Sequence, residues 1–224
     1  MKTEILRLDP KDATVQALRR VVRILRGGGL IVFPTDTFYG LGGDGFSPAV
    51  IRRIFRLKLR DTSRPLLVLV SDLEMVRRLA RDIPPVFWKI AEEFWPGPLT
   101  IALRASAAVP SELCGGGESL AVRLPAVFWL RELVREAGVP VIATSANISG
   151  EGEISTAEQA HRIFAGKVEL IVEGGMTPGG APSTVLDLTA APPRVIREGA
   201  VSTSRLDELF KQLGLVLTFP SGLC

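Results

Sequence analysis

The chain has 224 residues, of which 46% are hydrophobic, and this is enough to bury a sizeable core in one domain. The formal net charge of +3 allows contact with an anion but does not by itself indicate a nucleic-acid groove. The two cysteines, Cys114 and Cys224, form no C-x-x-C pair, which argues against a disulfide framework or a zinc knuckle and favours a reducing compartment.

The N-terminal segment lacks the long apolar core of a signal peptide. No later stretch approaches the roughly 18 uncharged apolar residues needed to span a bilayer, so we expect a soluble cytoplasmic protein without membrane contact.

The first predicted element is an amphipathic helix, in which Val15, Leu18, Val22 and Leu25 recur at helical spacing and glycines follow.

Helices and strands then alternate along the chain. Further helices are predicted at residues 47–57, 72–80, 84–95, 125–138, 155–166 and 206–213. Strands are predicted at residues 30–33, 65–70, 100–105, 119–124, 139–144, 168–172, 183–188 and 193–197. Ser47 with Pro48 is a good start for one helix, Gly138 ends another, and Ser155 with Glu158 forms a predicted capping box.

This alternation predicts an α/β fold with a twisted, open, mixed sheet flanked by helices. Adjacent strands near residues 100–123 and 168–197 imply some antiparallel pairing. We find no internal repeat, low-complexity segment or long linker, so residues 1–224 are expected to form a single domain. The glycine and proline clusters are therefore loops of that domain.

One such cluster, GLGGDG at residues 40–45, matches the dinucleotide-binding pattern G-x-G-x-x-G. In that motif the first glycine directly follows the strand, whereas here PTDTFY intervenes, so we interpret GLGGDG as a turn beside a ligand. The informative residues are Thr35, Asp36, Thr37 and Tyr39, which place donors and acceptors just beyond a buried strand, where open α/β sheets commonly bind ligands.

Three further loops carry candidate binding groups. In KLRDTSR, Lys58, Arg60 and Arg64 suit a triphosphate, although basic residues at a helix C-terminus are also favourable without a ligand. TSANISG, residues 144–150, offers hydroxyl and amide groups that can bind phosphate or form an ordinary turn. In the third loop, glycines and prolines deliver Ser183 to the start of a strand.

Several chemistries are disfavoured. The sequence contains neither a G-x-x-x-x-G-K-[ST] phosphate loop nor a G-x-S-x-G nucleophile elbow. His161 is the only histidine and falls in a predicted helix, which argues against a histidine-based triad or zinc site and favours a surface or core-edge position.

Together these segments resemble the YrdC-type threonylcarbamoyl-AMP synthases from about residue 14 to about residue 200. The resemblance rests on FPTDTFYGLG, K-x-R, PLLVLV, FWPGPLT, AVRLP, TSANISG and PSTVLDL with the following REG. It implies a YrdC-like fold with a central basic cavity and a short C-terminal tail at 201–224. The implied reaction joins L-threonine, bicarbonate or CO2, and ATP into threonylcarbamoyl-AMP and pyrophosphate.

The resemblance also implies roles for individual residues. Threonine would contact Thr37, Arg123 and Ser183. The nucleotide would contact Arg60, Arg64, Ser119, Ser145, Asn147 and Arg197. Lys58 and Arg60 would be catalytic through the phosphates, and Mg2+ would be bound through ATP and water. Arg123 alternates out of a predicted strand and could be solvated there, but a charged residue in AVRLP beside a predicted pocket favours contact with a ligand.

The implied product would pass to a threonylcarbamoyl-transferase complex that acts on tRNA. Leu69, Asp61 and Val127 depart from the family pattern, because many members have histidine, proline and histidine at these places; Leu69 puts strict selectivity for threonine in doubt. The alternative is an RNA-binding module without catalysis. Little aromatic interleaving with basic residues argues against it.

Overall fold

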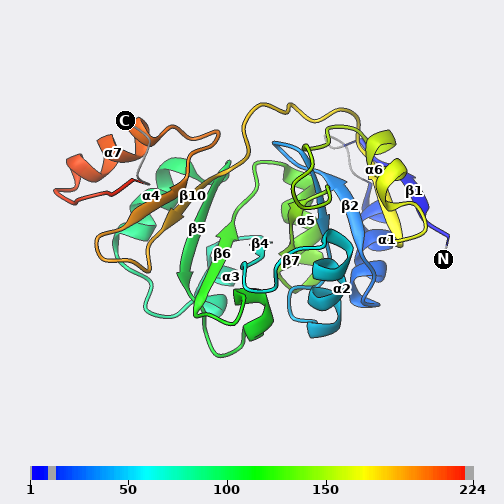
Figure 1. The fold of residues 1–224 in the computed structure, drawn as a ribbon, viewed down its shortest axis with the longest axis horizontal. Helices are drawn as coiled ribbons and strands as arrows, with labels where there is room; N and C mark the ends of the chain where they lie inside the picture. Colours follow the sequence, from blue (N-terminus) through cyan, green and yellow to red (C-terminus); the bar gives the residue numbers. More distant parts are fainter. Residues whose placement is uncertain (1, 10–13, 220–224) are drawn as a thin grey trace.

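The computed structural model describes residues 2–9 and 14–219, in which the strands form two mixed sheets flanked by helices (Figure 1). The five-stranded sheet has the order β1-β9-β2-β3-β8, and the six-stranded sheet has the order β11-β10-β5-β6-β4-β7. The mixed α/β class predicted from the sequence is confirmed, and the strands are divided between two sheets instead of forming one.

The strands are β1 (Glu4–Arg7), β2 (Ile31–Pro34), β3 (Tyr39–Gly42), β4 (Leu67–Leu69), β5 (Leu99–Arg104), β6 (Ser119–Arg123), β7 (Val141–Ile142), β8 (Thr144–Ser145), β9 (Leu170–Glu173), β10 (Thr184–Asp187) and β11 (Arg194–Arg197). The helices are α1 (Val15–Arg26), α2 (Pro48–Lys58), α3 (Leu73–Leu79), α4 (Val86–Phe94), α5 (Phe128–Ala137), α6 (Ala157–Phe164) and α7 (Thr203–Gln212), with a 3-10 helix at Ser111–Cys114.

The division into two sheets occurs at the predicted strand 139–144. Its first part, β7, pairs antiparallel with β4 in the six-stranded sheet. Its continuation, β8, pairs antiparallel with β3 in the five-stranded sheet. One apolar run therefore serves both sheets, because the chain crosses from one to the other at Ala143, whose N–H still donates to Leu67 O (2.9 Å).

Two strands have no counterpart among the sequence predictions. β1 pairs parallel with β9 at the edge of the five-stranded sheet. β3 contains the first part of GLGGDG, so the interpretation of residues 40–45 as a turn is wrong for Gly40–Gly42. These glycines permit close approach of neighbouring chain: a Cβ at Gly42 would lie 1.9 Å from Ile142 O.

Helices α1 and α5 lie together against the core. Val21, Val22 and Leu25 of α1 are buried, as the helical periodicity predicted, and Trp129 of α5 makes an edge-on contact with Phe33 of β2 at a ring-centroid distance of 6.4 Å. Removing a side chain as buried as Leu25 typically costs about 2 to 5 kcal/mol. This packing holds the five-stranded sheet, and hence one wall of the site described below.

The helix starts follow the predicted chemistry, with one shift. Ser47 caps α2, and its Oγ accepts from Val50 N (3.4 Å). The capping box of α6 uses Thr156 and Gln159 instead of Ser155 and Glu158. The prediction was wrong by one residue because α6 begins at Ala157.

The last features to place are the C-terminal tail, the single histidine and the cysteines. Val195 N donates to Thr218 O (2.8 Å), so the described tail lies beside β11. His161 is exposed on α6, and Cys114 is buried and free, while Cys224 lies outside the described residues. Among the described residues, none of the helices has both the length and the apolar character needed to cross a bilayer.

Candidate functional site

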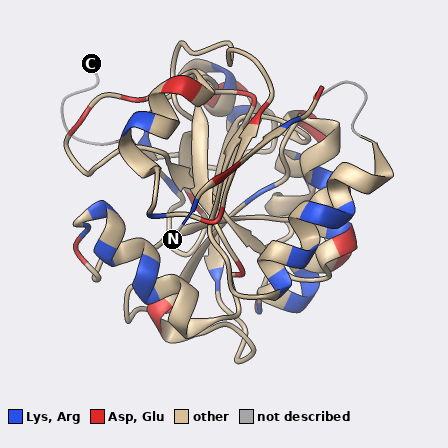
Figure 2. Cartoon of the chain, turned by 90° about the vertical axis from the view of Figure 1, so that its right-hand side faces the viewer, with Lys and Arg blue, Asp and Glu red and all other residues tan. Residues whose placement is uncertain are grey.

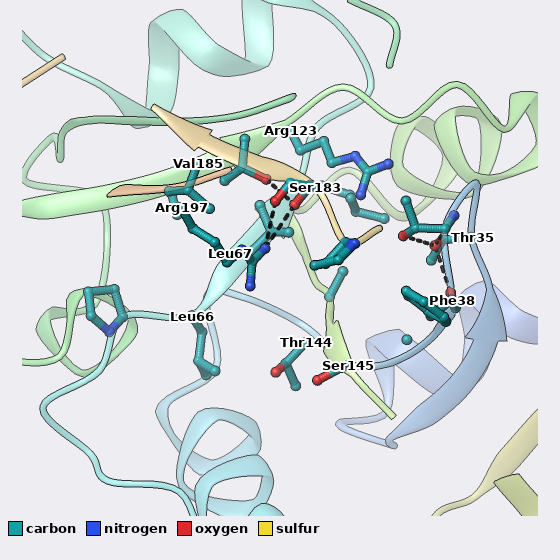
Figure 3. Close-up of a pocket in the computed structure, with 18 of the residues that line it drawn as sticks. Thr35, Phe38, Leu66, Leu67, Arg123, Thr144, Ser145, Ser183, Val185 and Arg197 are labelled. Carbon is teal, nitrogen blue, oxygen red and sulfur yellow. Dashed lines mark hydrogen bonds between the residues drawn. The ribbon is translucent and has the colours of Figure 1, made fainter. Parts of the chain in front are cut away.

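A cavity of about 350 Å3 lies between the two sheets (Figure 3). The five-stranded sheet contributes residues of the β2–β3 loop, β3 and β8, and the six-stranded sheet contributes β4, β5, β6, β10 and β11. On β6 the lining residues are Ser119, Ala121 and Arg123, which alternate along the strand and therefore share one face.

The β2–β3 loop forms one wall and is held by its own hydroxyls. Thr35 Oγ1 donates to Phe38 O (2.7 Å) and accepts from Thr37 N (3.1 Å). The hydroxyls of Thr35 and Thr37 lie 3.1 Å apart, and Thr37 O accepts from Gly179 N (2.9 Å). The loop is thus fixed on both sides, and Thr37 lines the cavity as part of an ordered wall.

Arg123 is buried on the opposite wall, so the solvated alternative for this residue is excluded. Its Nε donates to Gly97 O (3.0 Å), and its Nη2 lies 2.6 Å from Asp36 Oδ1. Both oxygens of Asp36 are buried, and neither accepts a hydrogen bond from a described residue, so this contact is an attraction of opposite charges. Asp36 and Arg123 connect the two walls of the cavity.

Arg197 and Ser183 form a second polar group in the cavity (Figure 3). Arg197 Nη2 donates to Ser183 O (2.7 Å), and Ser183 Oγ lies 2.9 Å from Thr100 Oγ1. Burial lowers the pKa of Arg197, and the charge of Arg123 lowers it further while Glu153 raises it. Positive charge is therefore concentrated at this end of the cavity.

Arg60 reaches the cavity from the segment after α2. Its Nη2 donates to Pro65 O (3.0 Å), while its buried Nε has no hydrogen-bond partner among the described residues. Burial lowers the pKa of Arg60, and the charges of Arg64 and Arg197 lower it further. An anion between Arg60 and Arg197 would relieve this repulsion and give the free N–H a partner.

Lys58 is buried and does not line the cavity. Its Nζ donates to three oxygens of the 145–147 loop: Ser145 O (2.5 Å), Asn147 O (2.7 Å) and Asn147 Oδ1 (3.0 Å). Because an ammonium has three N–H groups, no donor remains for a phosphate in this arrangement. Burial, followed by the charge of Arg60, lowers the pKa of Lys58 to about 8.

The structure thus brings most of the predicted site residues together. Seven of them line the cavity: Thr37, Arg60, Ser119, Arg123, Ser145, Ser183 and Arg197. Three do not: Lys58 and Asn147 are buried, and Arg64 is exposed. The roles of all ten in binding or catalysis stay predictions.

Glu153 lines the cavity and was not singled out from the sequence. Glu153 is exposed as a residue, but partial burial of its carboxyl raises the pKa of that group, whereas Lys58, Arg197 and a hydrogen bond from Ser145 lower it. The only feature of the sequence that could have indicated Glu153 is its position shortly after the S-x-N loop. That position does not show whether the chain turns back so that Glu153 lines the cavity.

The arrangement suits a ligand with several anionic oxygens. Three guanidinium groups, on Arg60, Arg123 and Arg197, are distributed around small hydroxyl side chains. Guanidinium groups can stabilise phosphate or carboxylate charge, and hydroxyls can fix its orientation. Elsewhere, Lys and Arg lie mainly on the flanking helices, on both sides of the central strands (Figure 2).

Comparisons with known proteins find a family model and similar sequences. A sequence model of the Sua5_yciO_yrdC family, described as "Telomere recombination", matches residues 23–199. The chain is 38% identical over 204 residues to a threonylcarbamoyl-AMP synthase of Pyrococcus abyssi, covering 91% of this chain and 59% of that protein. It is 32% identical over 200 residues to the enzyme of that name from Bacillus subtilis, covering 89% and 56%.

The fold is also similar to a solved structure. The P. abyssi Sua5 protein complexed with L-threonine superposes with a TM-score of 0.91 at 35% identity, over 98% of this chain and 63% of that one. The chain therefore spans less than two thirds of the length of these relatives. The matched model covers most of the sequence and includes the segments that line the cavity, and the chain belongs to the Sua5/YciO/YrdC family.

Proposed function

We propose that the chain is a threonylcarbamoyl-AMP synthase. In the proposed reaction, the α-amine of L-threonine combines with CO2 and loses a proton, or combines with bicarbonate with loss of water, to give a carbamate. An oxygen of that carbamate attacks the α-phosphorus of ATP, a P–O bond breaks, and pyrophosphate leaves. The observation that carries the proposal is the gathering of Arg60, Arg123 and Arg197 in one cavity of a chain related to such synthases.

The proposed division of the cavity follows its two polar groups. Threonine would contact Thr37, Arg123 and Ser183, with the Asp36 carboxylate keeping Arg123 in place. The nucleotide would contact Arg60, Ser119, Ser145 and Arg197. These groups need no covalent nucleophile, because positioning and stabilisation of developing negative charge can supply most of the catalysis of phosphoryl chemistry.

Lys58, Asn147 and Arg64 have indirect parts in this proposal. Lys58 would hold the loop that carries Ser145 and Asn147. Arg64 would act on the nucleotide only through its charge, which also lowers the pKa of Arg60. A rearrangement that frees Lys58 for a phosphate would give it the catalytic role expected from the family.

Magnesium would enter with ATP. The described residues contain no group of three or more His, Cys, Asp or Glu side chains that could hold a metal ion. Magnesium commonly keeps several waters and binds through substrate phosphates and one or two carboxylates, a pattern that this cavity can accommodate. When bound, it would neutralise part of the phosphate charge.

The product implies a partner. Threonylcarbamoyl-AMP is a reactive mixed anhydride, so a transferase complex that passes the threonylcarbamoyl group to tRNA is proposed as its acceptor. Direct RNA contact by this chain stays a prediction.

The test is pyrophosphate release from ATP by the purified protein with magnesium and bicarbonate. Release that depends on L-threonine supports the synthase, and release with L-serine instead supports the chemistry but not the substrate. No release with either amino acid would overturn the proposal and favour a binding role.

Arg60 offers a matched binding test. We expect ATP to raise the melting midpoint of the wild-type protein and to have little effect on Arg60→Ala, because a ligand stabilises only the state that binds it. Arg56→Ala is the control, since Arg56 is exposed on α2. An unchanged ATP shift in Arg60→Ala would remove Arg60 from the nucleotide site.

A further inference from the structure

Two carboxylates line the cavity within the described part of the chain, and they differ in availability. Asp36 is ion-paired with Arg123, and both of its oxygens are buried. Glu153 is exposed and forms no ion pair within 4.0 Å in the described structure. Of the two, Glu153 is the carboxylate that an incoming cation can reach.

Glu153 stands among the groups expected to bind the nucleotide. It lines the same cavity as Arg60, Ser145 and Arg197. Partial burial raises the pKa of its carboxyl group, and the charges of Lys58 and Arg197 lower it. Arg197 in turn acts on Arg60. An anion held between Arg60 and Arg197 is therefore a neighbour of Glu153.

A carboxylate in this position is unfavourable for a bare triphosphate. Two anionic groups at close range repel each other. A divalent cation between them reverses the sign of the interaction, and magnesium sites beside phosphates commonly use one or two carboxylates. The carboxylate oxygens of Glu153 are thus suitable ligands for a divalent cation that is bound to the nucleotide.

We propose that Glu153 is the protein's own ligand, directly or through a water molecule, for the magnesium ion that accompanies ATP. The inference rests on the proposed function, because it requires ATP in the cavity. It adds a protein group to a metal that the family resemblance attributes to ATP and water alone. It also predicts that this chain distinguishes magnesium-bound from free nucleotide.

The experiment measures the dissociation constant of ATP by calorimetry, once with magnesium and once with EDTA, for the wild type, Glu153→Gln and Glu151→Gln. For the wild type, magnesium should tighten binding. In Glu153→Gln this gain should shrink about tenfold, the scale of effect seen when groups that support a metal are removed. Binding in EDTA should stay equal or become tighter, because a negative charge has been removed.

Glu151→Gln is the matched control, because Glu151 is exposed two residues earlier and does not line the cavity. It should behave as the wild type. A second readout is the electron paramagnetic resonance spectrum of Mn2+ with ATP, in which Glu153→Gln should reduce the protein-bound fraction. The melting midpoint of each variant without ligand verifies folding.

The outcomes separate the two proposals. If Glu153→Gln tightens ATP equally with and without magnesium, Glu153 only repels phosphate and the inference is overturned. If the wild type binds ATP but magnesium makes no difference, the inference fails while the nucleotide site stands. If the wild type binds no ATP under either condition, the proposed function fails with it.

Discussion

At the residue scale, the ion pair between Asp36 and Arg123 shows how the cavity retains a buried positive charge. Arg123 is 5% exposed at its side chain and Asp36 14%, so neither charge is well hydrated. Leaving one member of such a pair alone typically costs about 3 to 5 kcal/mol, whereas removing both avoids an uncompensated charge. The pair is therefore a unit, and its members should not act additively.

We expect Asp36→Asn and Arg123→Met each to lower the free energy of unfolding by about 3 kcal/mol. The double variant should lose less than the sum by at least about 1 kcal/mol. Urea denaturation of the four proteins measures this coupling. If the two single losses in the free energy of unfolding simply add in the double variant, the 2.6 Å contact between Asp36 and Arg123 contributes no coupling energy.

This pair also marks a limit of sequence reasoning. Asp36 and Arg123 were both noted as polar groups near predicted strand ends, and both line the cavity. Their pairing could not be predicted, because it depends on how two sheets face each other. The same reason explains Glu153: nothing local in the sequence distinguishes it from Glu151, which does not line the cavity.

Lys58 gives a pH-dependent prediction. Folding lowers its pKa from 10.5 to about 8, so between these values the unfolded chain binds more protons than the folded one. The cost of burying the charged amine is fully present below pH 8 and is relieved as pH rises. Relative to Lys58→Met, the wild type should gain up to about 3 kcal/mol of stability between pH 8 and pH 10.5.

The measurement is urea denaturation of both proteins across this pH range. The difference between them isolates Lys58 from other groups that titrate at high pH. A difference that stays constant with pH would show that the amine keeps its proton, and a difference that falls would give the pKa shift the opposite sign.

At the element scale, β3 explains where the sequence patterns succeed and where they fail. Helices with clear apolar periodicity, such as α1 and α5, were predicted within a few residues of their observed bounds. β3 was missed because two of its four residues are glycines, which are depleted in strands. The reason for glycine is contact with the neighbouring chain, and a single sequence does not contain that information.

Gly42 tests this explanation. A Cβ there would lie 1.9 Å from Ile142 O and 2.8 Å from a ring carbon of Phe33, so Gly42→Ala should destabilise the fold by about 3 kcal/mol or more. Gly152→Ala is the control, because its Cβ would meet nothing within 4 Å; it should change stability by less than about 0.5 kcal/mol. A Gly42→Ala protein with an unchanged urea midpoint would show that the two strands can separate without cost.

At the scale of the whole molecule, the cavity lies where two sheets meet, and its walls come from both. The sheets are also joined directly by two backbone hydrogen bonds beyond β3: Ile142 N donates to Gly43 O (2.9 Å), and Gly45 N donates to Pro140 O (2.8 Å). We call this region, where the two hydrogen bonds join the sheets, the junction. A ligand that contacts both walls of the cavity would connect the two sheets in addition to these hydrogen bonds.

This arrangement predicts that bound ligands slow the opening of the junction. Amide hydrogen exchange reports such local opening. With ATP and L-threonine together, exchange at Ile142 and Gly45 should slow more than with either ligand alone, because each ligand limits the freedom that the other must restrict. The Phe210 amide in α7, at the far end of the molecule from β2 in Figure 1, is the reference. Equal slowing at Phe210 would indicate stabilisation of the whole chain, whereas no slowing at Ile142 and Gly45 would mean that the ligands do not connect the sheets.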